Sequence, residues 1–185
     1  MIIWLASYPK SGNTLLRSIL AAYFFSNDGK FNLDHLNGIT QFPLLNQFLR
    51  LGIDISNDKT IFENFIEAQK EINNIEKNKI NFLKTHAALA KINDVKFTDL
   101  NNTLGALYIV RDPRNVVTSF AHHMGLEINA ATETMIDPTR WLLKTEKNAK
   151  TFLGSWNLHY NSWKKIGKKG LIIKYEDLVE KKKTT

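Results

Sequence analysis

The sequence predicts an α/β fold with a central parallel sheet of about four strands flanked by helices. Four short apolar runs, at residues 2–6, 80–84, 104–110 and 171–173, have the length of buried strands. The segments between them carry apolar residues at helical spacing. Strands that alternate with helices form parallel sheets with right-handed crossovers. Neither an internal repeat nor a low-complexity linker interrupts the sequence, so we expect a single domain over residues 1–185.

Three helices are predicted in the first half of the chain. Residues 14–25 follow the first strand and place apolar side chains on one helical face, which should pack on the sheet. Residues 42–51 have the pattern of a short helix. Thr60 is expected to cap a longer helix that runs to about Ile75.

Three more helices are predicted in the second half. Asp112 is a good N-cap and Pro113 a good first helical residue, so we expect a helix from there to about His123. The apolar spacing predicts two further helices, over residues 139–149 and 154–166, before the last strand.

The composition is that of an ordinary globular protein, with 43% hydrophobic and 23% charged residues. The absence of cysteine excludes disulfides, thiolate metal sites and cysteine nucleophiles, and it fits a reducing, cytoplasmic location. The sequence shows neither a signal peptide nor an apolar run near the roughly 20 residues of a membrane span.

The net charge is +7, and eight lysines lie within residues 164–183. We interpret this segment as a solvated basic end. It lacks the interleaved aromatic residues of a single-strand nucleic-acid binder, so nucleic acid is not an expected partner. A basic surface would still attract an anionic ligand.

Polar side chains gather after each of the four predicted strands. The sets lie at residues 8–14, 84–86, 111–119 and 175–177. Because the C-terminal ends of parallel strands meet at one edge of a sheet, and ligands bind there, we expect these sets to form one site.

Lys10, Ser11, Gly12, Asn13 and Thr14 form the predicted loop between the first strand and the first helix. Gly12 allows a tight turn and the close approach of a ligand. Free backbone N–H groups and the positive helix end attract anions, and Lys10 adds a full charge. The loop therefore predicts a cradle for an anion such as phosphate; the alternative is a plain turn with an exposed lysine. It is not a Walker A loop, because the lysine and serine precede the glycine.

The third-strand set suggests a second phosphate contact. Arg111 ends this strand and Ser119 lies about two turns into the following helix, so one phosphate near the helix start could contact both. The alternative is a surface ion-pair cluster of Arg111 with Asp112 and Arg114.

The second-strand set contains the best candidate for catalysis. Lys84 and His86 are two residues apart at a strand end, where alternation puts both side chains on one side. Histidine can take a proton near neutral pH, and lysine can neutralise developing charge. A structural histidine is the alternative. His122 and His123 are adjacent, and since neighbouring helical residues point about 100° apart, we expect no metal site there.

Together these motifs resemble the sulfotransferases that use 3′-phosphoadenosine 5′-phosphosulfate (PAPS). Residues 8–14 (Tyr-Pro-Lys-Ser-Gly-Asn-Thr) resemble the 5′-phosphosulfate loop of that family, and residues 108–119 resemble its 3′-phosphate motif. Residues 84–86 match the segment that holds its catalytic histidine, and residues 154–156 and 175–177 match two weaker landmarks. The resemblance extends from residue 5 to about residue 179, and implies a three-layer sandwich similar to the P-loop NTPases.

The resemblance implies in-line transfer of a sulfuryl group from PAPS to an acceptor hydroxyl or amine, without a covalent enzyme intermediate or a metal, leaving adenosine 3′,5′-bisphosphate (PAP). His86 would be the general base. The resemblance further implies that Lys10 stabilises the departing 5′-phosphate and that Lys84 faces the sulfuryl oxygens. Arg111 and Ser119 would hold the 3′-phosphate, and Tyr175 would lie on the adenine side. The 5′ end of the nucleotide would be surrounded by Ser11, Gly12, Asn13 and Thr14.

The sequence departs from the family pattern in two places. Leu15 stands where the family often has a tryptophan that stacks on adenine. The family normally continues past the fourth strand into a glycine-rich Gly-x-x-Gly-x-Trp-Lys segment, whereas this sequence stops at Thr185, so we expect a C-terminally truncated domain.

Two alternative functions follow from the residues. One is a truncated, non-catalytic module that binds a nucleotide or another anion. The other is a small-molecule P-loop kinase, against which the missing Walker glycine and magnesium carboxylate count. The expected acceptor is a small molecule, a lipid or a sugar, bound between the long insertions at residues 26–79 and 124–150.

Overall fold

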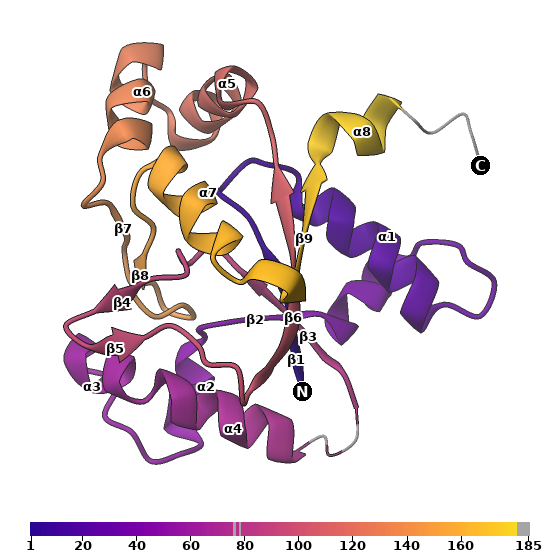
Figure 1. The fold of residues 1–185 in the computed structure, drawn as a ribbon, viewed down its shortest axis with the longest axis vertical. Helices are drawn as coiled ribbons and strands as arrows, with labels where there is room; N and C mark the ends of the chain where they lie inside the picture. Colours follow the sequence, from indigo (N-terminus) through magenta and orange to yellow (C-terminus); the bar gives the residue numbers. More distant parts are fainter. Residues whose placement is uncertain (76, 78, 181–185) are drawn as a thin grey trace.

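A five-stranded parallel sheet forms the centre of the protein, which a computed structural model describes over residues 1–75, 77 and 79–180 (Figure 1). Its strands, in spatial order, are β2 (Thr40–Gln41), β3 (Asn81–Thr85), β1 (Ile2–Ala6), β6 (Thr103–Val110) and β9 (Gly170–Lys174). Each neighbouring pair is parallel, with β1 in the middle. The predicted α/β fold is confirmed, and β2 is an additional edge strand. Residues 181–185, the end of the predicted basic segment, lie outside the described residues.

Helices cover both faces of this sheet. They are α1 (Asn13–Phe25), η1 (Leu33–Gly38), α2 (Leu45–Leu49), α3 (Asp58–Glu63), α4 (Phe65–Ile75), α5 (Pro113–Met124), α6 (Ile128–Ile136), α7 (Trp156–Lys164), η2 (Gly167–Lys169) and α8 (Tyr175–Glu180). The short strands β4 (Lys91–Ile92) and β5 (Val95–Lys96) pair with each other, as do β7 (Trp141–Leu142) and β8 (Thr151–Phe152). Over the described ranges, none of the helices is long and apolar enough to cross a bilayer.

Alternating side chains of β1 divide the core between the two faces. Trp4 is buried in a cluster that includes Phe65 of α4 and Trp163 of α7. Its neighbour Leu5 points the other way and packs in a cluster with Ala21 of α1. This arrangement is the expected three-layer sandwich, with α1 on one side of the sheet and α7 on the other (Figure 1).

The helix predicted from Thr60 to Ile75 is in fact two helices, and the predicted cap was wrong. Asn57 is the cap, because its side-chain oxygen accepts a hydrogen bond from the backbone N–H of Lys59 at 2.9 Å. The break falls at Asn64, whose side-chain Nδ2 donates to the Thr60 carbonyl at 2.8 Å. Asparagine side chains that bond to nearby backbone compete with helical hydrogen bonds.

The helix predicted over residues 139–149 does not form. The helix of this region is α6, which the sequence analysis did not predict and which ends before Pro138. The following segment folds back on itself as the β7–β8 hairpin. The Thr145 hydroxyl stabilises its turn by accepting a hydrogen bond from the backbone N–H of Asn148 at 3.0 Å.

Candidate functional site

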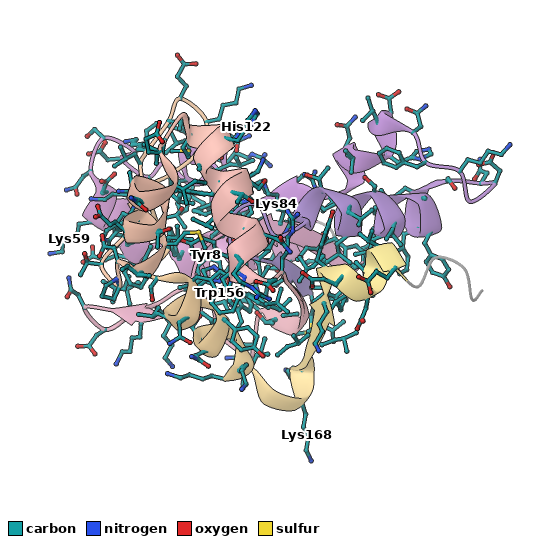
Figure 2. All side chains as sticks on the ribbon, turned by 90° about the horizontal axis from the view of Figure 1, so that it is seen from above. Tyr8, Lys59, Lys84, His122, Trp156 and Lys168 are labelled. Atoms are coloured by element: carbon teal, nitrogen blue, oxygen red, sulfur yellow. The ribbon has the colours of Figure 1, made fainter. Side chains whose placement is uncertain are left out.

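The C-terminal ends of four parallel strands surround a cleft of about 680 Å³. All but one of the predicted site residues line it: Lys10, Gly12, Asn13, Thr14, Lys84, His86, Arg111, Ser119 and Tyr175. The exception, Ser11, is buried inside the loop. The opposite wall is formed by α5 and by residues at and around β2 and the β7–β8 hairpin. Figure 2 looks down on the molecule from above the view of Figure 1, with Lys84 near the middle.

The loop between β1 and α1 presents an uncapped helix start. Lys10 and Gly12 have left-handed φ angles of 67° and 95°, which turn the chain sharply into α1. A Cβ on Gly12 would lie 2.3 Å from a ring carbon of Tyr175, so glycine is required there. Among the described residues, α1 has no side-chain cap. Its first N–H groups and its positive dipole end are therefore available to an anion.

Two polar side chains of this loop point inward. Nδ2 of Asn13 donates to the carbonyl of Leu5 at 2.9 Å and to the hydroxyl of Ser7 at 3.2 Å, which ties the loop to the end of β1. Oγ of Ser11 is buried and has no hydrogen-bond partner among the described residues. Because an unpaired buried polar group costs about 1–3 kcal/mol, this hydroxyl is a good candidate to donate to a bound anion.

Arg111 lies at the end of β6 against the ring of Tyr175. Its Nη1 donates to the carbonyl of Lys10 at 3.2 Å, and its guanidinium carbon is 4.6 Å from the Tyr175 ring centroid. Its Nε is buried and, within the described part of the chain, has no partner. Ser119 on α5 lines the same cleft. A partly free guanidinium and a hydroxyl are thus available for phosphate binding.

His86 is held in one tautomer by the end of β1. Its Nδ1 lies 2.8 Å from the carbonyl oxygen of Ser7 and 3.3 Å from the hydroxyl of the same residue. Because a carbonyl can only accept, Nδ1 carries the proton and Nε2 keeps a free lone pair. Burial, followed by the positive charges of Lys84 and Arg17, lowers the pKa of His86 to about 4. The ring is therefore neutral at pH 7 and can accept a proton at Nε2.

A second buried histidine supports the backbone at His86. Nε2 of His159, on α7, donates to the His86 carbonyl at 3.2 Å, and its Nδ1 accepts from the Tyr108 hydroxyl at 2.9 Å. Burial lowers the pKa of His159 to about 3. His159 was not predicted from the sequence, because its position on the buried face of a helix resembles that of any core side chain.

These two histidines should make the protein less stable in acid. Both have pKa values below the ordinary 6.5, so the unfolded chain binds more protons than the folded one as the pH falls below about 6.5. We expect the free energy of unfolding to fall by about 2.7 kcal/mol for each unit that the pH is lowered near pH 5, because the chain takes up two protons when it unfolds there. Urea denaturation between pH 7 and pH 5 would measure this, and a His159→Gln variant that still folds should show about half the slope. A midpoint independent of pH would contradict it.

Lys84 is linked to the β7–β8 hairpin through a glutamine. Its Nζ donates to Oε1 of Gln41 at 3.0 Å, and Nε2 of Gln41 donates to Oδ1 of Asn148 at 2.7 Å. Burial, and then the charge of Arg17, lowers the pKa of Lys84 to about 8. The ammonium therefore remains charged at pH 7 but loses its proton at a lower pH than an ordinary lysine.

Gln41 and Arg17 were missed by the sequence analysis. Gln41 lies on β2, which has two residues and is too short to show a periodic pattern. Arg17 lies on α1, where its guanidinium donates to the carbonyl of Ile39 at 3.0 Å and so holds the segment that leads into β2. Arg17 is the one charged residue of α1, and this was the signal that could have revealed it.

The fold and the cleft define an α/β protein with a basic cleft at the C-terminal ends of its parallel strands. A family model described as "Sulfotransferase domain" matches residues 2–185, and the chain therefore belongs to the sulfotransferase domain family. No curated protein sequence matches this chain.

Solved structures of similar fold confirm this architecture. One is mouse sulfotransferase SULT7A1 complexed with PAP, with 20% identity and a TM-score of 0.55, covering 97% of this chain and 53% of that one. Another is retinol dehydratase in complex with androsterone and inactive cofactor PAP, with 17% identity and a TM-score of 0.57, covering 97% of this chain and 55% of that one. The chain thus spans just over half the length of these proteins.

Proposed function

We propose that the protein containing this chain transfers a sulfuryl group from PAPS to an acceptor hydroxyl or amine, with His86 as the general base. The observation that carries the proposal is the hydrogen bond from His86 Nδ1 to the Ser7 carbonyl, which leaves Nε2 free in a cleft with several cationic groups. A neutral imidazole beside an anion-binding loop is the arrangement that proton removal and transfer of an anionic group require.

With a hydroxyl acceptor, the acceptor proton passes to Nε2 of His86 as the acceptor oxygen attacks sulfur. The bond from sulfur to the 5′-phosphate oxygen breaks, and its electron pair leaves with that oxygen, giving a sulfate ester, PAP and an imidazolium. Negative charge grows on the departing oxygen, where Lys10 and the N–H groups of α1 would stabilise it, and Lys84 would face the sulfuryl oxygens.

The residues present suit the nucleotide assigned to them. Ser11 and Arg111 each have a buried polar atom without a partner in the described residues, and a 5′-phosphosulfate and a 3′-phosphate would supply acceptors for both. Ser119 would add a hydroxyl to the 3′-phosphate. Tyr175, besides its proposed place on the adenine side, packs on Arg111 and would hold that guanidinium in position.

The acceptor would enter from the side of the β7–β8 hairpin. The cleft wall there combines apolar side chains such as Phe42 and Leu142 with the polar Arg140 and Asn148. A mixed wall of this kind suits a small molecule, lipid or sugar that presents a hydroxyl to His86.

PAP should raise the melting temperature of the protein more than ATP or AMP does, because neither of these carries a 3′-phosphate. A ligand at 100 times its Kd stabilises a protein by about 2.7 kcal/mol. Arg111→Ala should weaken PAP binding at least tenfold, since a hydrogen bond to a charged group contributes about 1.5–3 kcal/mol. Calorimetry and thermal melts would measure both effects.

Arg114→Ala is the matched control, since this exposed arginine pairs with Asp112 and does not line the cleft. It should bind PAP as the unaltered protein does. Equal Kd values for PAP and AMP would rule out the assignment of Arg111 and Ser119 to a 3′-phosphate.

A further inference from the structure

A second pocket, of about 320 Å³, lies beside α3 and the short β4–β5 hairpin, and none of its lining residues lines the cleft at the strand ends. Its lining is mainly apolar and includes Phe62, Ala88, Val95, Trp141 and Phe152. A concave apolar pocket of this size is typical of a small-molecule site.

The β7–β8 hairpin is the wall between this pocket and the cleft. Its residues alternate between the two sides: Arg140, Leu142, Ala149 and Thr151 line the cleft, whereas Trp141, Lys150 and Phe152 line the pocket. Successive strand residues point to opposite faces, which explains the alternation. The pocket is therefore distinct from the proposed donor and acceptor positions.

The interior of the pocket suits a hydrocarbon chain. The Trp141 ring lies 5.3 Å from the Phe62 ring and 5.1 Å from the Phe152 ring, between centroids. Three alanines, Ala87, Ala88 and Ala90, also line the pocket, and their small side chains take up little of its space. The backbone N–H of Ala88 already donates to the Phe152 carbonyl at 2.9 Å, so this donor is not free for a polar ligand.

The rim of the pocket is positively charged. Three lysines, Lys59, Lys96 and Lys150, line it together with one carboxylate, Glu63. Lys59 lies 3.7 Å from Glu63, and Lys150 lies 3.8 Å from Asp58, both as loose surface ion pairs. Lys59 is labelled at the edge of the molecule in Figure 2.

These cations are available to a ligand. Within the described part of the chain, Lys96 forms neither an ion pair nor a side-chain hydrogen bond. The Lys59–Glu63 pair is exposed, and the Lys150–Asp58 pair is half-buried, with Lys150 Nζ also 5.1 Å from the Trp141 ring centroid. Because ion pairs near the surface are weak, a ligand anion could replace their partners at little cost. The charge of the rim thus complements a negatively charged headgroup.

We propose that this pocket binds a medium-chain fatty acid anion, with its hydrocarbon chain against Trp141 and Phe152 and its carboxylate at the lysine rim. The hydrocarbon chain would remove apolar surface from water, which would be the main favourable contribution to its binding. The carboxylate would take its hydrogen bonds from Lys96, with Lys59 and Lys150 nearby. This site needs neither PAPS nor an acceptor and is independent of the proposed sulfuryl transfer.

Quenching of tryptophan fluorescence by ω-bromodecanoate tests the proposal, because a bromine atom quenches an indole that it touches. We expect saturable quenching of the full protein, competed by decanoate, and the loss of most of it in Trp141→Phe. Quenching that is unchanged in Trp141→Phe would place the fatty acid elsewhere and overturn the assignment.

The headgroup and the pocket are tested separately. Lys96→Glu should weaken binding of ω-bromodecanoate at least tenfold, and Ala88→Leu should abolish it by filling the pocket. Decyltrimethylammonium, which has the same tail and the opposite charge, should bind at least tenfold more weakly than decanoate. Equal binding of the two amphiphiles would overturn the role of the lysine rim.

The melting shift produced by PAP, which would bind in the cleft, shows whether a pocket variant is correctly folded. Lys96→Glu and Ala88→Leu should keep the melting shift that PAP produces in the unaltered protein. If Ala88→Leu fails to fold, Ala90→Leu fills the same pocket from the neighbouring turn. A fatty acid that binds both filled variants as tightly as the unaltered protein would refute the proposal.

Discussion

His86→Gln should lower the rate of sulfuryl transfer by about two to four orders of magnitude, which is the usual contribution of a general base. Glutamine can keep a hydrogen bond to the Ser7 carbonyl but has no lone pair that accepts a proton near neutral pH. PAP binding should change by less than about twofold, because the proposed phosphate contacts lie on Lys10 and Arg111. Release of PAP from PAPS, in the presence of an acceptor found by screening hydroxyl compounds, would measure the rate.

His122→Gln is the control for this experiment. His122 is exposed on α5, outside the cleft, and is labelled in Figure 2. It should retain the full rate. A His86→Gln variant that turns over normally would eliminate the proposed base. Full PAP binding without turnover in the unaltered protein would instead favour a nucleotide-binding module.

The charge of Lys84 should set the alkaline limit of the reaction. Its pKa of about 8 means that the ammonium loses its proton as the pH rises through 8, so kcat/KM should fall there. On the acid side, kcat/KM should hold until the pH approaches 4, where His86 becomes protonated. Lys84→Met should lower kcat by about 10²- to 10³-fold, which is the usual effect of removing a group that stabilises transition-state charge.

Lys84→Arg separates charge from titration. A guanidinium remains charged at all accessible pH values, so this variant should lose the fall in kcat/KM near pH 8 even if its rate is lower. An alkaline limb that stays at pH 8 in Lys84→Arg would assign that limb to another group. Lys169→Met, on η2 and outside the cleft, is the matched control and should leave the profile unchanged.

The parts of the fold and site that could be predicted are those that depend on residues close together in the sequence. Buried strands of five to eight residues appear as apolar runs, and the chemistry follows their ends, so Lys10, His86 and Arg111 were predicted to meet, and all three line the cleft. Asp112 was predicted as a cap because capping depends on near neighbours, and its side chain does accept from the backbone of Arg114.

The parts that could not be predicted depend on distant contacts. The segment at 139–149 has helical spacing, yet the pairing of Trp141 with Phe152 and the packing of Trp141 on Phe62 favour a hairpin. Gln41 bonds to both Lys84 and Asn148, and Asn148 lies 107 residues after Gln41 in the sequence. Nothing in the sequence around these residues indicates such contacts. These hairpin and bridging residues line the side of the cleft proposed for the acceptor, where the sequence was least informative.

The Ser7 carbonyl that orients His86 has a consequence for the electrostatics of transfer. Many catalytic histidines are oriented by an aspartate, which brings a full negative charge close to the ring. Here the partner of Nδ1 is a neutral peptide group. A carboxylate in that position would repel the phosphosulfate as it approaches and would oppose the charge that builds on the leaving oxygen. The peptide dipole fixes the direction of the imidazole without adding an anion to a site whose proposed donor, PAPS, is itself strongly anionic.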